Sequence, residues 1–153
     1  MQPRTDYTTA APGAYAAMRA LETYVHQSGL EARLLELVRT RVSQINRCAY
    51  CIDMHTQMAR VAGETEQRLY ALSAWHETPF FTERERAALA WAEALTRVAE
   101  GSVPDDLYHA ARGHFGDKGL ADLSLAIVAI NGWNRMAIAF ATPPGSYRRA
   151  RSE

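Results

Sequence analysis

Residues 34–55 read LLELVRTRVSQINRCAYCIDMH, and this segment carries two signals. Its first half places leucine, valine and isoleucine three and four residues apart, which is the spacing that gives a helix one apolar face. Its second half places Cys48, Cys51 and His55 at intervals of three and four residues, so the three side chains share one face of a helix. The segment therefore predicts two helices that separate near Asn46, the second carrying a line of reactive groups.

The rest of the chain repeats the helical spacing, and the alternating pattern of strands is missing. We therefore predict an all-α helical bundle of about six to seven helices. We expect these helices at residues 12–27, 28–45, 47–62, 64–75, 82–101, 104–112 and 120–140.

Local signals mark several of the predicted ends. Pro12 suits a first helical turn, and Gly63 suits a left-handed C-terminal cap. Asn46 is the expected N-cap of the helix that carries the cysteines. Residues 28–31 and 82–85 each have the spacing of a capping box, in which a Ser or Thr and a Glu satisfy each other's backbone N–H groups.

The last predicted helix is apolar around most of its circumference. It should be buried on several sides, either centrally in the fold or under a neighbouring subunit. Gly113, Gly116 and Gly119 are expected to interrupt the chain before it. The final residues, 148–153, are expected to form a solvated basic end.

Composition excludes some classes of partner. The 17 basic and 17 acidic residues of the 153 give a formal net charge of zero, so no overall field attracts nucleic acid or an anionic membrane. Residues 1–15 lack the apolar run of a signal peptide, and the longest uncharged apolar stretch, residues 123–134, is too short to cross a bilayer. We expect a cytoplasmic protein without nucleic-acid or membrane partners.

The two cysteines point to chemistry or a metal, because a bridge across so short a loop adds little stability. At a helix N-terminus, free N–H groups and the helix dipole lower the pKa of a thiol. A thiolate is the nucleophile in thiol peroxidases and in disulfide exchange, and a second thiol nearby resolves the oxidised sulfur. His55, one turn after Cys51, can take or return the proton.

Glu36 lies twelve residues before Cys48 on the preceding predicted helix. A chain reversal near Asn46 would bring it over His55. Burial beside the neighbouring leucines would raise the pKa of Glu36 towards that of a general base. The alternative is a glutamate that faces solvent at the helix edge.

Zinc and inert packing are the alternative interpretations of the cysteine pair. A structural zinc ion needs four ligands, and the sequence has no second cysteine pair and no further histidine at matching spacing. A CxxC pair in a reducing compartment favours redox work over two inert buried cysteines. We expect no metal and no cofactor.

Glu36, Cys48, Cys51 and His55 together form the pattern Glu-x11-Cys-x2-Cys-x3-His. This pattern resembles the AhpD-like branch of the carboxymuconolactone decarboxylase superfamily, and the likeness covers residues 34–96, including RVSQINRCAYC at residues 41–51. The later segment NGWNRMAIAF, residues 131–140, resembles the extended peroxidase-related subfamily.

The resemblance implies an all-helical protein that assembles as trimers or hexamers and has alkylhydroperoxidase activity. It implies that Cys51 is the peroxidatic thiolate, that Cys48 is the resolving thiol, and that Glu36 acts through His55 to deprotonate Cys51. In relatives a histidine precedes the second cysteine, where this chain has Tyr50. Relatives that decarboxylate a lactone lack the cysteine pair, which disfavours that reaction here.

Several other side chains invite a structural or a functional interpretation. Tyr50 either donates a hydrogen bond to a substrate or packs at a subunit contact, and packing is favoured. Trp133 either lines a pocket with the polar residues that follow it, or Asn134 and Arg135 bind the backbone of a neighbouring loop, and the structural role is favoured. Met54 and Met58 are expected in the core.

We expect one AhpD-like domain, residues 1–153, with a redox core at about 30–100 and a C-terminal helical extension at about 104–142. The leading hypothesis is a thiol-dependent alkylhydroperoxidase for antioxidant defence, which takes a peroxide substrate and a thiol reductant or redox partner protein. One alternative is a disulfide reductase or redox adaptor for a partner such as a peroxiredoxin or a lipoylated protein. Another is a zinc-bound, non-enzymatic oligomeric protein.

Overall fold

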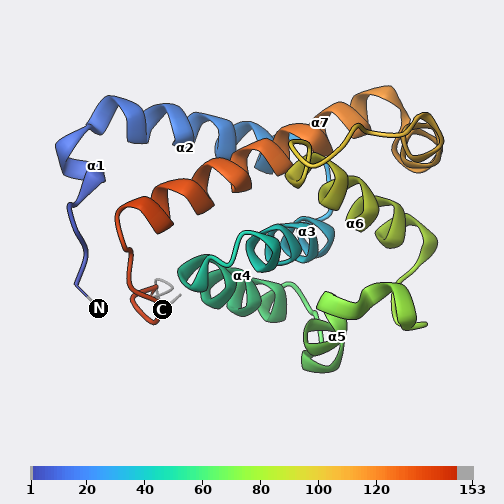
Figure 1. The fold of residues 1–153 in the computed structure, drawn as a ribbon, viewed down its shortest axis with the longest axis horizontal. Coiled ribbons are helices and arrows are strands. Elements are labelled where there is room, and N and C mark those ends of the chain that lie inside the picture. The colour runs from blue at the N-terminus through green and yellow to red at the C-terminus, as the bar shows by residue number, and fades with distance from the viewer. Residues whose placement is uncertain (1, 148–153) are drawn as a thin grey trace.

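Helices form the regular structure of residues 2–147, the part of the chain that the computed structural model describes (Figure 1). The expected basic end at residues 148–153 lies outside these described residues. In chain order the elements are α1 (Tyr7–Ala10), α2 (Pro12–Gln27), α3 (Ala32–Ile45), α4 (Ala49–Val61), α5 (Glu66–Ala71), the 3-10 helix η1 (Leu72–Glu77), α6 (Glu83–Thr96) and α7 (Asp105–Ala139). The all-α prediction is confirmed, and α1 is an addition to the predicted set.

Helix α3 packs against α4, α6, α7 and η1, and it supplies side chains to three separate apolar clusters. On one side Val38 and Val42 pack with residues of α6 and α7. On another side Leu37 packs with Leu72 and Trp75 of η1. Burying each such aliphatic side chain contributes about 1.5–3 kcal/mol, so the position of α3 is strongly fixed.

Three of the predicted helix ends are confirmed. Pro12 lies in the first turn of α2, and Gly63 follows α4 with a φ of 89°. At the start of α6, the backbone N–H of Glu85 donates to the Thr82 hydroxyl, while the Glu85 carboxylate accepts from the Thr82 backbone. Both partners of the expected capping box are therefore present.

Two predicted caps are wrong. The capping box expected at residues 28–31 does not form, because α3 begins at Ala32 and the Ser28 hydroxyl donates to the Val25 carbonyl at the end of α2. Asn46 ends α3, and Cys48 is the N-cap of α4. The intervening Arg47 has a φ of 57°, which turns the chain between the two helices.

The second half of the chain departs from prediction in its boundaries. The helix expected at residues 64–75 divides into α5 and η1, and α6 ends at Thr96 before Gly101. Of the three glycines expected to interrupt the chain, Gly116 does so: its φ of 66° and ψ of 179° break the helical path within α7. Gly113 and Gly119 are helical.

Helix α7 runs beside α2 and also packs against α3 and α6 (Figure 1). These neighbours cover most of its apolar surface, so it is buried by its own chain, although Val128 and Ile138 remain exposed. Within residues 2–147, no helix is long and apolar enough to span a membrane.

The two ends of the described chain meet beside α4. The backbone N–H of Arg4 donates to the Phe140 carbonyl at 2.9 Å, and the Tyr7 ring lies 5.1 Å from the Phe140 ring. After α7, the backbone N–H of Gly145 donates to the Asp53 carboxylate of α4 at 2.9 Å. These contacts join the N-terminal segment to the end of α7 and place the segment after α7 against the helix that carries the cysteines.

Candidate active site

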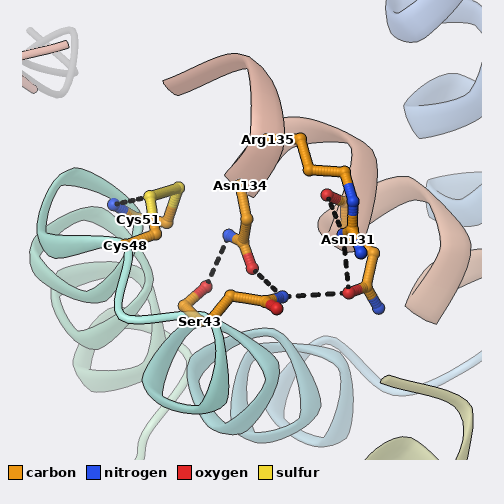
Figure 2. Close-up of a disulfide and its surroundings, with 7 residues drawn as sticks. Ser43, Cys48, Cys51, Asn131, Asn134 and Arg135 are labelled. Atoms are coloured by element: carbon orange, nitrogen blue, oxygen red, sulfur yellow. Dashed lines mark hydrogen bonds between the residues drawn. A yellow bond between two sulfur atoms is a disulfide. The ribbon is translucent and has the colours of Figure 1, made fainter. Parts of the chain in front are cut away.

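Cys48 and Cys51 form a disulfide at the start of α4, with their Cα atoms 5.3 Å apart (Figure 2). The backbone N–H of Cys51 donates to the Cys48 sulfur at 3.3 Å, so this sulfur acts as the N-cap acceptor of the helix. Each cysteine is only 1% exposed, and the pair packs against Ala137 of α7 and Tyr50. The prediction that the cysteines lie at a helix N-terminus is confirmed.

Asparagines of α7 hold the turn that precedes the cysteines. The Asn46 side chain donates to Asn131 at 2.9 Å and to Asn134 at 2.8 Å. Asn134 is fully buried and donates in turn to the Ser43 hydroxyl at 3.0 Å (Figure 2). Asn134 therefore has the structural role favoured from the sequence, through side chains of the turn.

Glu36 reaches His55 across the reversal between α3 and α4. One Glu36 oxygen lies 2.8 Å from Nδ1 of His55, and both side chains are buried. The alternative of a solvent-facing glutamate is wrong, because Glu36 is 3% exposed.

The pKa of Glu36 lies below the ordinary value for glutamate, so the expectation that burial would raise this pKa is wrong. Burial does favour the neutral acid, but the hydrogen bond and charge of His55, together with those of Arg39, outweigh burial. At neutral pH Glu36 is therefore a carboxylate. It accepts the Nδ1 hydrogen of His55, which leaves Nε2 of His55 for proton transfer.

Arg39 and Glu22 extend this pair and were not among the residues expected at the site. Arg39 donates to Glu36 at 2.7 Å and to Glu22 of α2 at 2.5 Å. Glu22 also accepts from the indole N–H of Trp133 at 3.0 Å. The spacing of Arg39 from Glu36, three residues on one helix, was a visible signal, whereas Glu22 and Trp133 belong to other helices.

A cavity of about 700 Å³ opens beside these groups and is lined by both Cys51 and His55. Its wall is rich in aromatic and thioether side chains: Tyr7, Tyr15, Tyr50, Met54, Met58, Trp133 and Tyr147. Cys48 is not part of the wall. Cys51 is therefore the cysteine that a molecule in the cavity would meet.

The cavity corrects the expectations for three side chains. Met54 and Met58 are half-buried and line the cavity, so they do not belong to the closed core. Trp133 also lines it while bonding Glu22, which combines the two interpretations weighed for it.

Tyr50 stands where the family resemblance led us to expect a histidine in relatives. Burial, followed by the neighbouring Tyr147, Tyr15 and Asp53, raises its pKa above the ordinary value. Tyr50 therefore keeps its proton at neutral pH and can donate a hydrogen bond, but it cannot serve as a base there.

The described residues, 2–147, contain no cluster of three or more His, Cys, Asp or Glu side chains arranged to hold a metal ion. The two cysteines are instead joined to each other in the disulfide, and His55 contacts Glu36.

The sequence model of the Carboxymuconolactone decarboxylase family matches residues 12–94, which is more than half of the chain. The chain belongs to this family. The chain is also 46% identical over 139 residues to YdfG, an uncharacterized protein of Bacillus subtilis (strain 168). The match covers 91% of this chain and 95% of YdfG.

Solved structures of similar proteins agree with the assignment to the carboxymuconolactone decarboxylase family. A protein of unknown function from Agrobacterium tumefaciens, proposed to be the antioxidant defence protein AhpD, is 43% identical and superposes with a TM-score of 0.91 over 95% of this chain and 100% of that one. An uncharacterized peroxidase-related protein from Silicibacter sp. TM1040 is 26% identical, with a TM-score of 0.76 over 86% and 70% of the two chains. The fold is thus that of the AhpD-like members.

Proposed function

We propose that this protein is a thiol-dependent alkylhydroperoxidase that cycles between the Cys48–Cys51 dithiol and disulfide. The observation that carries the proposal is the cavity beside Cys51, which also contains a histidine paired at 2.8 Å with a buried, ionised carboxylate. A nucleophile (Cys51), a proton carrier (His55) and a carboxylate that orients it (Glu36) thus lie next to a cavity large enough for a ligand.

The catalytic cycle starts from the reduced protein. His55 takes the proton of Cys51, and the Cys51 thiolate attacks the outer oxygen of the hydroperoxide. The O–O bond breaks, Cys51 becomes a sulfenic acid, and the leaving alkoxide receives the proton from His55 to give an alcohol. Glu36 keeps His55 in the orientation and tautomer that this transfer needs.

Cys48 then attacks the sulfenic acid sulfur. The new S–S bond releases the sulfenic oxygen as water, and the disulfide of the structure is the product. An external thiol reductant restores both thiols by exchange and leaves as its own disulfide. The sum converts one hydroperoxide and two thiols into an alcohol, water and one disulfide.

The cavity wall favours an organic hydroperoxide over hydrogen peroxide. Tyr7, Tyr15, Trp133 and the two methionines offer apolar contact to an alkyl or aryl group, which hydrogen peroxide lacks. The Agrobacterium relative proposed to be AhpD and the peroxidase-related Silicibacter relative support the same direction.

The site draws on the whole chain, which supports treating residues 1–153 as one AhpD-like domain. The cavity includes Tyr7 from the N-terminal segment, Cys51 from α4, and Trp133 and Ala137 from α7. The core at about 30–100 and the extension at about 104–142 therefore contribute to one site together.

Peroxide consumption with a dithiol reductant tests the proposal. We expect turnover of an organic hydroperoxide by the wild type, loss with Cys51→Ser, and loss of multiple turnover with Cys48→Ser. Full activity of Cys51→Ser would overturn the assignment of Cys51. Rapid exchange with dithiols but no consumption of any hydroperoxide would favour the disulfide reductase instead.

A further inference from the structure

Arg39 is a buried cation of α3. Its side chain is 2% exposed, and it lies between Glu36 and Glu22, whose side chains are 5% and 15% exposed. Removing charges from water is costly, and an apolar side chain of similar size is often as stable in such a place. Packing alone therefore does not account for an arginine here.

The contacts of Arg39 connect the cavity wall to the proposed proton carrier. Trp133 donates to Glu22, Glu22 accepts from Arg39, Arg39 donates to Glu36, and Glu36 contacts His55, at distances of 3.0, 2.5, 2.7 and 2.8 Å. The cavity is lined by Glu22 and Arg39 as well as by His55 and Cys51. This series of contacts from Trp133 to His55, here called the charged line, ends at His55, which lines the same cavity as Cys51.

We propose that Arg39 and Glu22 are positioning residues that set the charge beside Glu36 and, through Glu36 and His55, the acidity of Cys51. This inference rests on the proposed function for the role of Cys51. The positive charge of Arg39 favours an ionised Glu36, and an ionised Glu36 holds the Nδ1 side of His55, the proposed proton carrier for Cys51. A positive charge on this line also favours the Cys51 thiolate, and a negative charge disfavours it. Glu22 orients Arg39 and partly offsets its positive charge.

Other titratable or charged groups face the same cavity from each neighbouring element. They are Asp6 and Tyr7 of the N-terminal segment, Tyr15, Arg19 and His26 of α2, Tyr50 of α4, and Tyr147 after α7. Among these, His26 comes near the charged line, with Nε2 3.9 Å from Glu22. Its side chain is 58% exposed, so solvent screens its effect on Glu36.

Arg39 and Glu22 carry opposite charges, so removing one or the other should shift the pH dependence of Cys51 reactivity in opposite directions. Removing the arginine cation should raise the pH at which Cys51 becomes reactive, and removing the Glu22 anion should lower it. A purely structural role would change the stability of the fold but would not move this pH in opposite directions for the two variants.

The measurement is the rate of alkylation of Cys51 by iodoacetamide against pH, in the full-length reduced protein with Cys48→Ser. Serine leaves a single thiol and keeps an N-cap acceptor for α4. Arg39→Met should raise the midpoint of the profile by about 0.5 unit or more, and Glu22→Gln should lower it by a similar amount. Arg39→Lys, which keeps the charge, should restore a midpoint near that of the parent.

Arg84→Met and Glu31→Gln are the matched controls, because they remove the same charges from an exposed ion pair of 2.8 Å and should leave the midpoint unchanged. If Arg39→Met does not fold, Glu22→Gln decides alone, and an unchanged or raised midpoint overturns the inference. Opposite shifts in a protein that consumes no hydroperoxide would support this inference while overturning the proposed function.

Discussion

Asn46 donates a side-chain hydrogen bond to Asn134 at 2.8 Å, although the two residues are 88 positions apart. This bond joins the turn before the cysteines to α7, and the same Asn134 side chain donates to Ser43 on α3. The geometry at the start of α4 is therefore held by a helix from the far end of the chain.

Asn134→Ala should destabilise the protein by about 2–3 kcal/mol, because it removes a fully buried side chain and its two hydrogen bonds. The buried Ser43 hydroxyl loses its Asn134 partner, while Asn46 keeps only its bond to Asn131. Urea unfolding followed by circular dichroism measures this loss. Arg135→Ala is the matched control, since Arg135 is exposed and bonds only within α7, to Asn131. A change below about 0.5 kcal/mol is expected for the control, and an equally small change for Asn134→Ala would contradict the prediction.

Some features of this fold could be read from the sequence because they depend on neighbours along the chain. The Thr82–Glu85 box, the first-turn Pro12 and the Gly63 cap involve contacts within one turn of helix. Cys51 and His55 share a helix face for the same reason. Such local signals do not depend on how the helices pack.

Asn46 shows why other features could not be predicted. Asparagine is a preferred N-cap, yet its side chain bonds two asparagines of α7, and Cys48 caps α4 in its place. Glu22 and Trp133 are similar cases, since their contacts join separate helices. The lowered pKa of Glu36 also depends on Arg39, whose burial against Glu22 follows from packing that no short pattern records.

Glu36→Gln should make stability less dependent on pH in the acid range. Because the pKa of Glu36 in the folded protein is lowered, its stabilising contribution is fully present above the ordinary glutamate pKa of about 4.3 and is lost as pH falls through the lower folded value. We expect the unfolding free energy of the wild type to fall more steeply below about pH 5 than that of Glu36→Gln.

Urea midpoints recorded at several acid pH values test this expectation. Glu77→Gln is the control, because Glu77 is exposed, and it should keep the wild-type slope. Other carboxylates with lowered pKa values, such as the half-buried Glu93, leave a residual slope in every variant. Identical slopes for the wild type and Glu36→Gln would show that Glu36 gains no stabilisation from its ionised form.

In the reduced protein, Cys48→Ala should be less stable than Cys48→Ser by about 1 kcal/mol. The Cys48 sulfur accepts the Cys51 N–H, and serine retains such an acceptor whereas alanine does not. Urea unfolding under reducing conditions compares the two variants. The pair Thr82→Ser and Thr82→Ala gives the reference for a known N-cap, and equal stability of the two Cys48 variants would mean that the sulfur does not cap α4.

Two glycines of α7, three positions apart, should respond to alanine in opposite directions. Gly116 has a φ of 66°, a conformation that costs a residue with a Cβ about 1–3 kcal/mol, although no atom within 4 Å would meet the added carbon. Gly113 is helical and equally open, so Gly113→Ala should stabilise the helix by up to about 1 kcal/mol. Thermal unfolding of both variants isolates backbone conformation from packing, and stabilisation by Gly116→Ala would mean that α7 continues without a break through residue 116.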